Sequence, residues 1–178
     1  MFKSENYVME IFNVLSKKES LNILKKYNKN LKKSLYYNFK NIDISKFKYL
    51  GKLEKCINFY KKEYPEIDLT ASKWKLASLR FKGFLKGQSF DSWHSEQCMS
   101  ALDRMLALQL YLTDHNCGTQ FFSQQVIKSE VGKVLLFPAY FTHTHRGQPC
   151  PEQKNRYIIT GYFNFYAPGK KEIDRRNV

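Results

Sequence analysis

A histidine and a glutamate two residues apart, His94 and Glu96, constrain this chain more than any other feature of its sequence. Residues i and i+2 of an extended strand point to the same side, so this imidazole and this carboxylate can hold one metal ion. Another imidazole, His143, follows 49 residues after His94, at the end of the apolar stretch that begins at Phe137. Two histidines and one carboxylate form the facial triad that holds non-haem Fe(II) and leaves coordination positions open. Further along, Arg156 offers a planar fork of donors that suits an anionic cosubstrate.

The strand pattern that such a site needs begins near residue 72. Trp74, Leu76 and Phe81 stand among charged residues in a strand-like pattern, and short apolar segments separated by turns follow. The segments 114–118 and 147–151 are rich in the residues that favour turns and loops.

Before residue 70, apolar residues recur at helical spacing. Ser16 and Glu19 resemble a capping box, and Pro65 is expected to end a helix. We therefore expect helices over residues 5–16, 16–27 and 45–64. The polar, lysine-rich segment 28–40 is predicted to be a loop or a weak helix. Helices first and strands afterwards indicate an α+β fold.

The composition is that of one folded domain. The chain has 178 residues, of which 43% are hydrophobic and 16% aromatic. It contains no apolar run of 18 residues and no recognisable signal peptide, so we expect a cytoplasmic protein without a membrane partner. The four cysteines form no CxxC pair, which favours reduced, inert thiols.

The net charge of +14 is distributed unevenly. Residues 1–90 contain 20 Lys and Arg against 8 Asp and Glu, whereas residues 91–178 contain 10 against 8. An anionic partner such as nucleic acid is one interpretation. We favour a solvated lysine-rich surface instead, because Arg80 is the only arginine in the first half and bidentate phosphate recognition favours arginine.

Five blocks, in order, resemble a known family. They are Lys86–Phe90, Arg104–Asp114, Gly118–Phe122, Gly132–Pro138 and Arg156–Phe163. Together with the metal motif they resemble the 2-oxoglutarate/Fe(II)-dependent dioxygenases, in particular the prolyl 4-hydroxylase-like branch. The resemblance covers about half of the chain.

This resemblance implies a double-stranded β-helix, the jelly-roll or cupin-like core, buttressed by N-terminal helices. It treats residues 1–178 as a single oxygenase domain. Residues 1–70 would be mainly helical support, residues 71–167 the β-helix core and residues 168–178 a tail.

The resemblance also assigns site residues. His94, Glu96 and His143 would be the metal ligands and the catalytic centre, with Glu96 in place of the commoner aspartate. His145 remains an alternative to His143: it lies 11 residues before Arg156, nearer the family's usual gap, but His143 matches the family position after the Phe-Pro run.

The cosubstrate 2-oxoglutarate would bind Arg156, with Tyr111 and Thr160 nearby. The serine that usually follows two residues after the arginine is replaced by Ile158, which leaves the second carboxylate contact open.

The implied activity is hydroxylation of an unactivated C–H bond with decarboxylation of 2-oxoglutarate to succinate. Its cofactors are Fe(II), 2-oxoglutarate and O₂, with ascorbate as an optional stimulant. A peptidyl or amino-acid substrate of the proline type is favoured, although a small molecule or a protein also fits. Oxidative demethylation of nucleic acid and a non-redox cupin-like binding module are the alternatives, and the oligomeric state is left open.

Overall fold

The computed structural model describes residues 1–69, 72–150 and 154–166. Its helices are α1 (Lys17–Tyr27) and α2 (Leu50–Glu63), with short 3-10 turns η1 (Ile44–Lys46), η2 (Pro65–Asp68) and η3 (Phe141–His143). Its strands are β1 (Phe2–Glu5), β2 (Val8–Ile11), β3 (Lys32–Lys33), β4 (Asn38–Ile42), β5 (Lys73–Phe84), β6 (Arg104–Tyr111), β7 (His115–Phe121), β8 (Val126–Ser129), β9 (Val134–Pro138), β10 (His145–Gly147) and β11 (Arg156–Tyr166).

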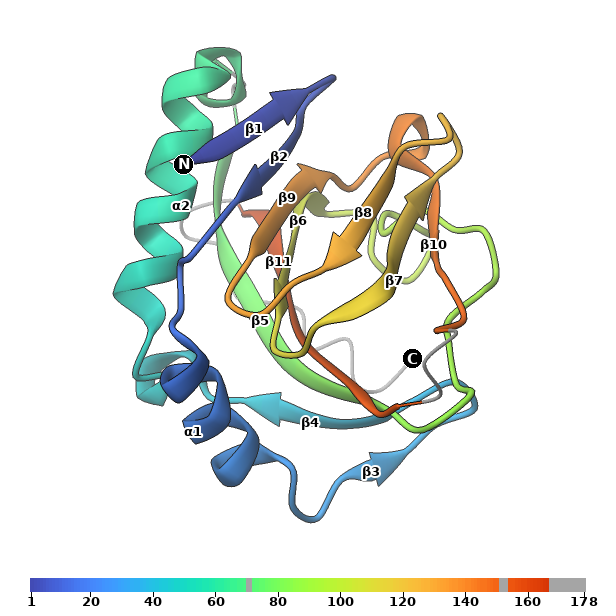
Figure 1. Cartoon of the computed structure of the whole chain (residues 1–178). Coiled ribbons are helices and arrows are strands. Elements are labelled where there is room, and N and C mark those ends of the chain that lie inside the picture. Colours follow the sequence, from blue (N-terminus) through green and yellow to red (C-terminus); the bar gives the residue numbers. More distant parts are fainter. Residues whose placement is uncertain (70–71, 151–153, 167–178) are drawn as a thin grey trace.

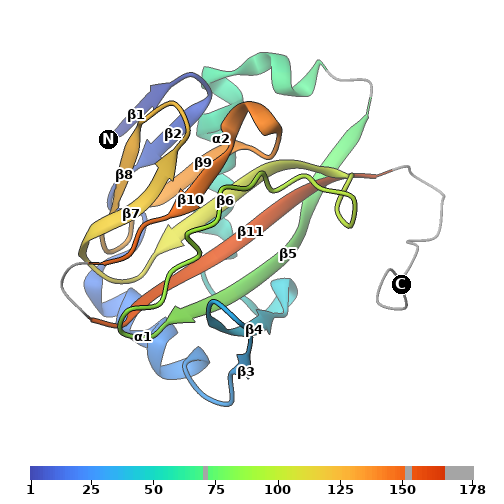
Figure 2. The same cartoon turned by 90° about the vertical axis from the view of Figure 1, so that its right-hand side faces the viewer.

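The strands form two sheets that face each other. The large sheet has eight strands in the order β1-β2-β9-β6-β11-β5-β4-β3, and the small sheet has three in the order β10-β7-β8. The two α-helices lie against the outer face of the large sheet, and the small sheet lies over its inner face (Figure 1). The connection between β5 and β6 runs lengthwise over that inner face, beside β10 (Figure 2).

Burial on both faces explains why the central strands are almost entirely apolar. In β6, Leu106, Leu108 and Leu110 pack toward the helices, whereas Ala107 and Tyr111 belong to the core between the sheets. Strand β9 alternates in the same way. Successive side chains of a strand point to opposite faces, so a strand covered on both sides reads as a continuous apolar run.

The two helices bury one face each. Ser16 and Glu19 form the predicted capping box of α1, and Tyr27 at its end stacks on Phe81 of β5 with ring centroids 6.3 Å apart. Helix α2 contributes Leu53 and Tyr60, among others, to the same core. A 3-10 turn beginning at Pro65 follows α2, as a proline that ends the helix predicts.

The helix predicted over residues 5–16 is wrong. Residues 2–11 form the hairpin β1–β2, whose two-residue turn at Asn6 and Tyr7 has positive φ at both positions. Val8 lies in the core between the sheets and Met9 in the core under the helices. Adjacent residues buried on opposite sides require a strand, and pairing of β2 with β9 supplies one.

Residues 28–40, predicted as a loop or a weak helix, contain β3 and the start of β4. Strand β4 pairs with β5, so it extends the large sheet although its composition is polar. Four strands therefore precede or separate the helices, and the predicted order of helices first holds only in part. The tail predicted over residues 168–178 lies outside the described residues. No described helix has the length and apolar character needed to cross a membrane.

Replacement of Gly132 by alanine tests the packing of the chain before α1 against the turn before β9. Gly132 has a φ of +79°, and an added Cβ would collide with the carbonyl oxygen of Leu15. Gly132→Ala should lower the free energy of unfolding by at least about 1–3 kcal/mol, the cost of a left-handed non-glycine residue. Gly51→Ala in α2 is the matched control, since its Cβ would meet only the flexible end of the Glu54 side chain, at 4.0 Å, and alanine favours the helix. Urea unfolding of both variants checks this, and equal effects would contradict it.

Candidate metal centre

His94, Glu96 and His145 come together on the inner face of the large sheet. One ligand atom from each of the three residues lies within 4.8 Å of the others. His94 belongs to the connection between β5 and β6, and it pairs with His145 of β10 through two backbone hydrogen bonds of 3.0 and 2.9 Å. Backbone pairing thus aligns two imidazoles from segments about 50 residues apart in the chain.

His145, and not the favoured His143, joins this cluster. The expectation for His143 rested on its match to the family position after the Phe-Pro run, but the 3-10 turn η3 ends at His143 and β10 begins only at His145. His143 Nε2 instead lies 2.7 Å from the carbonyl oxygen of Asn6. The geometry therefore supports His145, the alternative suggested by its spacing to Arg156.

The protonation of both imidazoles in the cluster suits metal binding. His94 Nδ1 lies 2.9 Å from the carbonyl oxygen of Ser92, and His145 Nδ1 lies 3.0 Å from that of His143. A carbonyl oxygen only accepts, so each Nδ1 carries a proton, which leaves Nε2 as the ring nitrogen available to a metal ion. His145 Nε2 is buried without a hydrogen-bond partner among the described residues and lies 3.5 Å from Glu96 Oε1. A metal ion held by the cluster would satisfy this nitrogen.

The electrostatics keep the ligands in their binding forms. Burial disfavours the charged form of Glu96, but the neighbouring His145, whose Nε2 lies 3.5 Å from Glu96 Oε1, and the positive charge of Lys82 outweigh it and hold the pKa of Glu96 at about 2. Burial, with His145 nearby, lowers the pKa of His94. At neutral pH, Glu96 is therefore a carboxylate and His94 is neutral, the forms that coordinate metals. Arg104 Nη1 donates to the Glu96 carbonyl at 2.9 Å and lies 3.6 Å from its carboxylate.

Arg156 lines the same cavity as the metal cluster, and one edge of its guanidinium is unused. Its Nη1 donates to the carbonyl oxygens of Gly118 and Gln148 at 3.3 and 3.4 Å, and its plane lies over Phe84. Its Nε is buried and has no hydrogen-bond partner among the described residues. A buried cation with an unsatisfied donor favours an anionic ligand.

Tyr111 lines the cavity beside Arg156, and its hydroxyl belongs to a polar chain. Thr119 Oγ1 donates to Gln109 Oε1 at 2.8 Å, so the Tyr111 hydroxyl, 2.9 Å from Thr119, is the donor to it. Burial raises the pKa of Tyr111, which keeps the hydroxyl protonated. Thr160 lies on the same face of β11 as Arg156 but is not among the residues that line the cavity, so its role stays a prediction.

Two features of the cavity were not anticipated from the sequence. Lys82 of β5 lines it, and its ammonium lies 4.7 Å from the ring centroid of Tyr37. A lysine in a strand reads as solvent-facing, and only the register with Ile158 of β11 turns it inward. The cavity has a volume of about 40 Å³, so a ligand larger than a few water molecules requires side chains to move.

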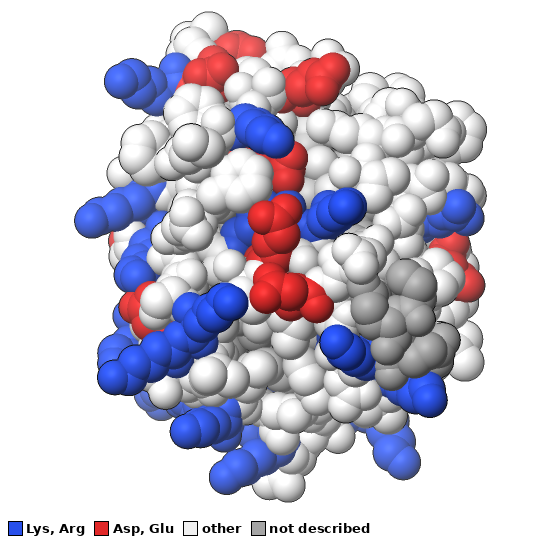
Figure 3. Space-filling model, in the orientation of Figure 1, with Lys and Arg blue, Asp and Glu red and all other residues white. Residues whose placement is uncertain are grey.

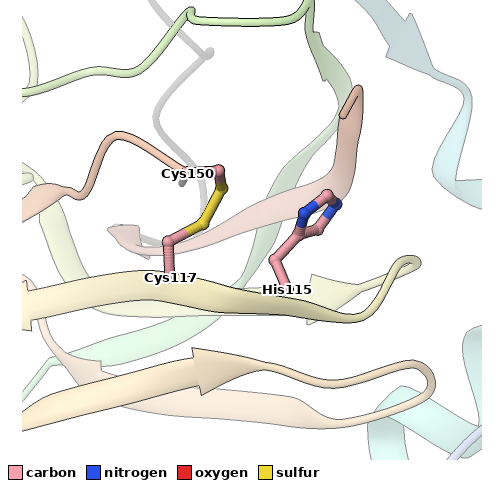
Figure 4. Close-up of side chains that lie close together, drawn as sticks. All are labelled: His115, Cys117 and Cys150. Carbon is pink, nitrogen blue, oxygen red and sulfur yellow. A yellow bond between two sulfur atoms is a disulfide. The ribbon is translucent and has the colours of Figure 1, made fainter. Parts of the chain in front are cut away.

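Cys117 and Cys150 form a disulfide, and His115 lies beside it (Figure 4). The prediction that all four cysteines are reduced is wrong for this pair. It failed because β7 and the segment after β10 are 33 residues apart in the sequence and become neighbours only in the small sheet. Bonded to each other, the two sulfurs are not ligands for a metal ion. The expectation of a cytoplasmic location loses the support of reduced thiols.

By sequence, the chain matches no protein-family model and none of the curated proteins. By structure, it is similar to a viral collagen prolyl hydroxylase from Paramecium bursaria Chlorella virus-1 solved as a 2-oxoglutarate (2OG) complex, with a TM-score of 0.74 and 17% identity over 91% of this chain and 97% of that one. A prolyl-4-hydroxylase from Pseudomonas putida matches with a TM-score of 0.71 and 12% identity over 90% of this chain and 93% of that one.

A prolyl hydroxylase from Trichoplax adhaerens, in complex with a peptide fragment of the hypoxia inducible factor oxygen degradation domain, matches with a TM-score of 0.68 and 15% identity. That match covers 89% of this chain and 84% of the other. The fold is therefore the jelly roll of the 2OG and Fe(II) oxygenases, in its prolyl 4-hydroxylase-like form, as the sequence resemblance implied.

Removal of each histidine in turn tests the ligand set. His145→Ala should weaken Fe(II) or Mn(II) binding by more than the roughly 10- to 100-fold that loss of an outer-shell partner costs. His143→Ala should leave the metal affinity unchanged, because its side chain is engaged with Asn6. Isothermal titration under anaerobic conditions measures both. Loss of affinity in His143→Ala with retention in His145→Ala would contradict the assignment.

Proposed function

We propose that this protein is an Fe(II)- and 2OG-dependent dioxygenase that hydroxylates an unactivated C–H bond. One observation carries the proposal: a His-Glu-His cluster and a buried arginine line one cavity, and each contains an orphaned polar nitrogen. A metal ion satisfies His145 Nε2, and a carboxylate satisfies Arg156 Nε. A bound 2OG would supply that carboxylate.

The residues present fit these groups. His94, Glu96 and His145 would hold Fe(II), and Arg156 would bind the carboxylate of 2OG that is remote from the metal. When bound, these groups together with O₂ supply the oxidising equivalents for hydroxylation and release succinate and CO₂. The chain itself orients the substrate and excludes water, since Phe84, Phe121 and Phe137 are buried around the site.

The arrangement of layers supports treating the chain as one oxygenase domain. Helices α1 and α2 share a core with the large sheet, so they brace the strands that carry the cavity on their other face. Tyr111 would contribute to 2OG binding by redirecting its hydroxyl from Thr119. Thr160, on the same face of β11 as Arg156, would contribute its buried hydroxyl, which has no hydrogen-bond partner among the described residues.

We propose a peptide or amino-acid side chain of the proline type as the substrate. The structural similarity to prolyl hydroxylases supports this, including one solved with a peptide. Next to the metal motif, the partly exposed rings of Trp93 and Phe122 pack edge to face with centroids 5.3 Å apart. Arg146 stacks on Trp93 from β10. An exposed aromatic pair beside the metal motif in the chain suits contact with a peptide.

The charge distribution gives the nucleic-acid alternative little support. On the face shown in Figure 3, most Lys and Arg side chains lie along the margin, and a column of Asp and Glu with a few basic side chains beside it runs through the centre. A nucleic-acid groove would require a continuous basic track. A non-redox cupin-like module would have no use for the unsatisfied edge of Arg156.

Anaerobic titration of the metal-free protein with Fe(II) and 2OG is the direct test. The proposal predicts the weak visible charge-transfer band of the chelate, and loss of that band in His94→Ala. Metal binding without the band would refute the oxygenase assignment and favour the binding module.

Arg156→Ala tests the cosubstrate contact separately. Truncation of one partner of a buried charge pair costs about 2–5 kcal/mol, so the dissociation constant of 2OG should rise roughly 30-fold or more. Arg146→Ala is the matched control, because this arginine stacks on Trp93 and does not line the cavity. Competition titrations at fixed metal concentration measure both, and similar effects of the two substitutions would count against the assignment.

A further inference from the structure

We propose that the Cys117–Cys150 disulfide is a positioning element for Arg156, so that breaking it weakens binding of 2OG without removing the metal site. This inference rests on the proposed function. The inference goes beyond the proposed function, because it assigns control of 2OG affinity to two cysteines that touch neither the metal ligands nor the substrate.

The first observation is where the guanidinium of Arg156 is anchored. Its Nη1 has three partners: the carbonyl oxygen of Gly118 at 3.3 Å, that of Gln148 at 3.4 Å, and Cys117 Sγ at 3.5 Å. Gly118 and Cys117 belong to β7, whereas Gln148 belongs to the segment that follows β10. The arginine is therefore held between two separate stretches of chain.

The second observation is what joins those stretches. The disulfide connects Cys117, beside Gly118, to Cys150, two residues after Gln148 (Figure 4). In this part of the sheet the Gln148 amide also donates to the Gly118 carbonyl at 2.9 Å. The covalent bond thus adds to the pairing of β10 with β7 in holding the two carbonyl groups that accept from Nη1 at a fixed spacing.

The third observation concerns Arg156 Nε, which lies on the edge of the guanidinium away from these contacts. Nε is buried and has no hydrogen-bond partner among the described residues, so the edge assigned to the cosubstrate is the one that the anchor leaves unused. With Nη1 held by these contacts, the guanidinium would have a defined orientation before any ligand arrives. Holding a binding group in place beforehand lowers the entropy that binding must remove.

Loss of the disulfide should weaken the contacts that hold Arg156 Nη1 without abolishing them. Reduction by a dithiol adds one electron and one proton to each cysteine sulfur, and the dithiol closes to its own disulfide. The two carbonyl contacts remain available, but the segment after β10 is then held to β7 mainly by hydrogen bonds. We expect 2OG binding to weaken about three- to tenfold, the factor associated with loss of one ordinary hydrogen bond.

Two preparations and one variant test the proposal. Wild-type protein is compared before and after reduction with dithiothreitol and anaerobic desalting, and Cys150→Ala breaks the bridge while leaving the Cys117 sulfur beside Arg156. Alkylation under denaturing conditions should count two free thiols in the first preparation, Cys56 and Cys98, and four after reduction. Cys98→Ser, at an exposed free cysteine, is the control and should behave as wild type.

The readouts separate positioning from a general loss of structure. Reduction and Cys150→Ala should raise the dissociation constant of 2OG, while Mn(II) affinity measured without 2OG stays unchanged. In an Arg156→Ala background, titrated over a wider concentration range, reduction should have no further effect, because the bridge acts through that side chain.

Each other outcome is decisive. Equal 2OG affinity in both redox states, an effect that persists in Arg156→Ala, or four free thiols in the purified protein would overturn this inference alone. No 2OG binding in either state, with metal bound, would overturn the proposed function and this inference with it.

Discussion

The backbone pairing of His94 with His145 is the interaction on which the rest of the site depends. It joins the connection after β5 to β10 by two hydrogen bonds, and it places both imidazoles on the same side of the chain as Glu96. Two further backbone hydrogen bonds hold the same connection, from Gly147 to Phe90 at 2.7 Å and from Gln97 to Ala139 at 2.8 Å. Loss of the pairing between His94 and His145 would free the two imidazoles from their fixed relation to the Glu96 carboxylate and Arg104.

The large sheet supplies a rigid wall for this pairing. Its central strands are buried on both faces, by the helices on one side and by the small sheet on the other. Residues on the inner face near one end of these strands are polar: Gln109 on β6, Lys82 on β5 and Arg156 on β11. These groups carry a desolvation cost in the metal-free protein, which bound ligands would offset.

Much of the fold and part of the site could be predicted from the sequence, and the failures have identifiable causes. The pair His94 and Glu96 follows from local spacing and the placement of Arg156 from the family resemblance, and the structure brings all three to one cavity. The choice between His143 and His145 depended on a single 3-10 turn that periodicity does not reveal. The hairpin at the N-terminus was mistaken for a helix, because Val8 and Ile11 fit a helical spacing as well as a strand that is buried on both sides. The disulfide and the inward position of Lys82 depend on strand register, which one sequence does not specify.

A crystal structure with Mn(II) and 2OG, with anomalous diffraction used to locate the metal, would test the assigned metal ligands and the 2OG contact together. We expect a single anomalous peak coordinated by His94 Nε2, Glu96 and His145 Nε2, with a carboxylate of 2OG on Arg156. A metal ion bound at His143, or 2OG bound away from Arg156, would contradict it.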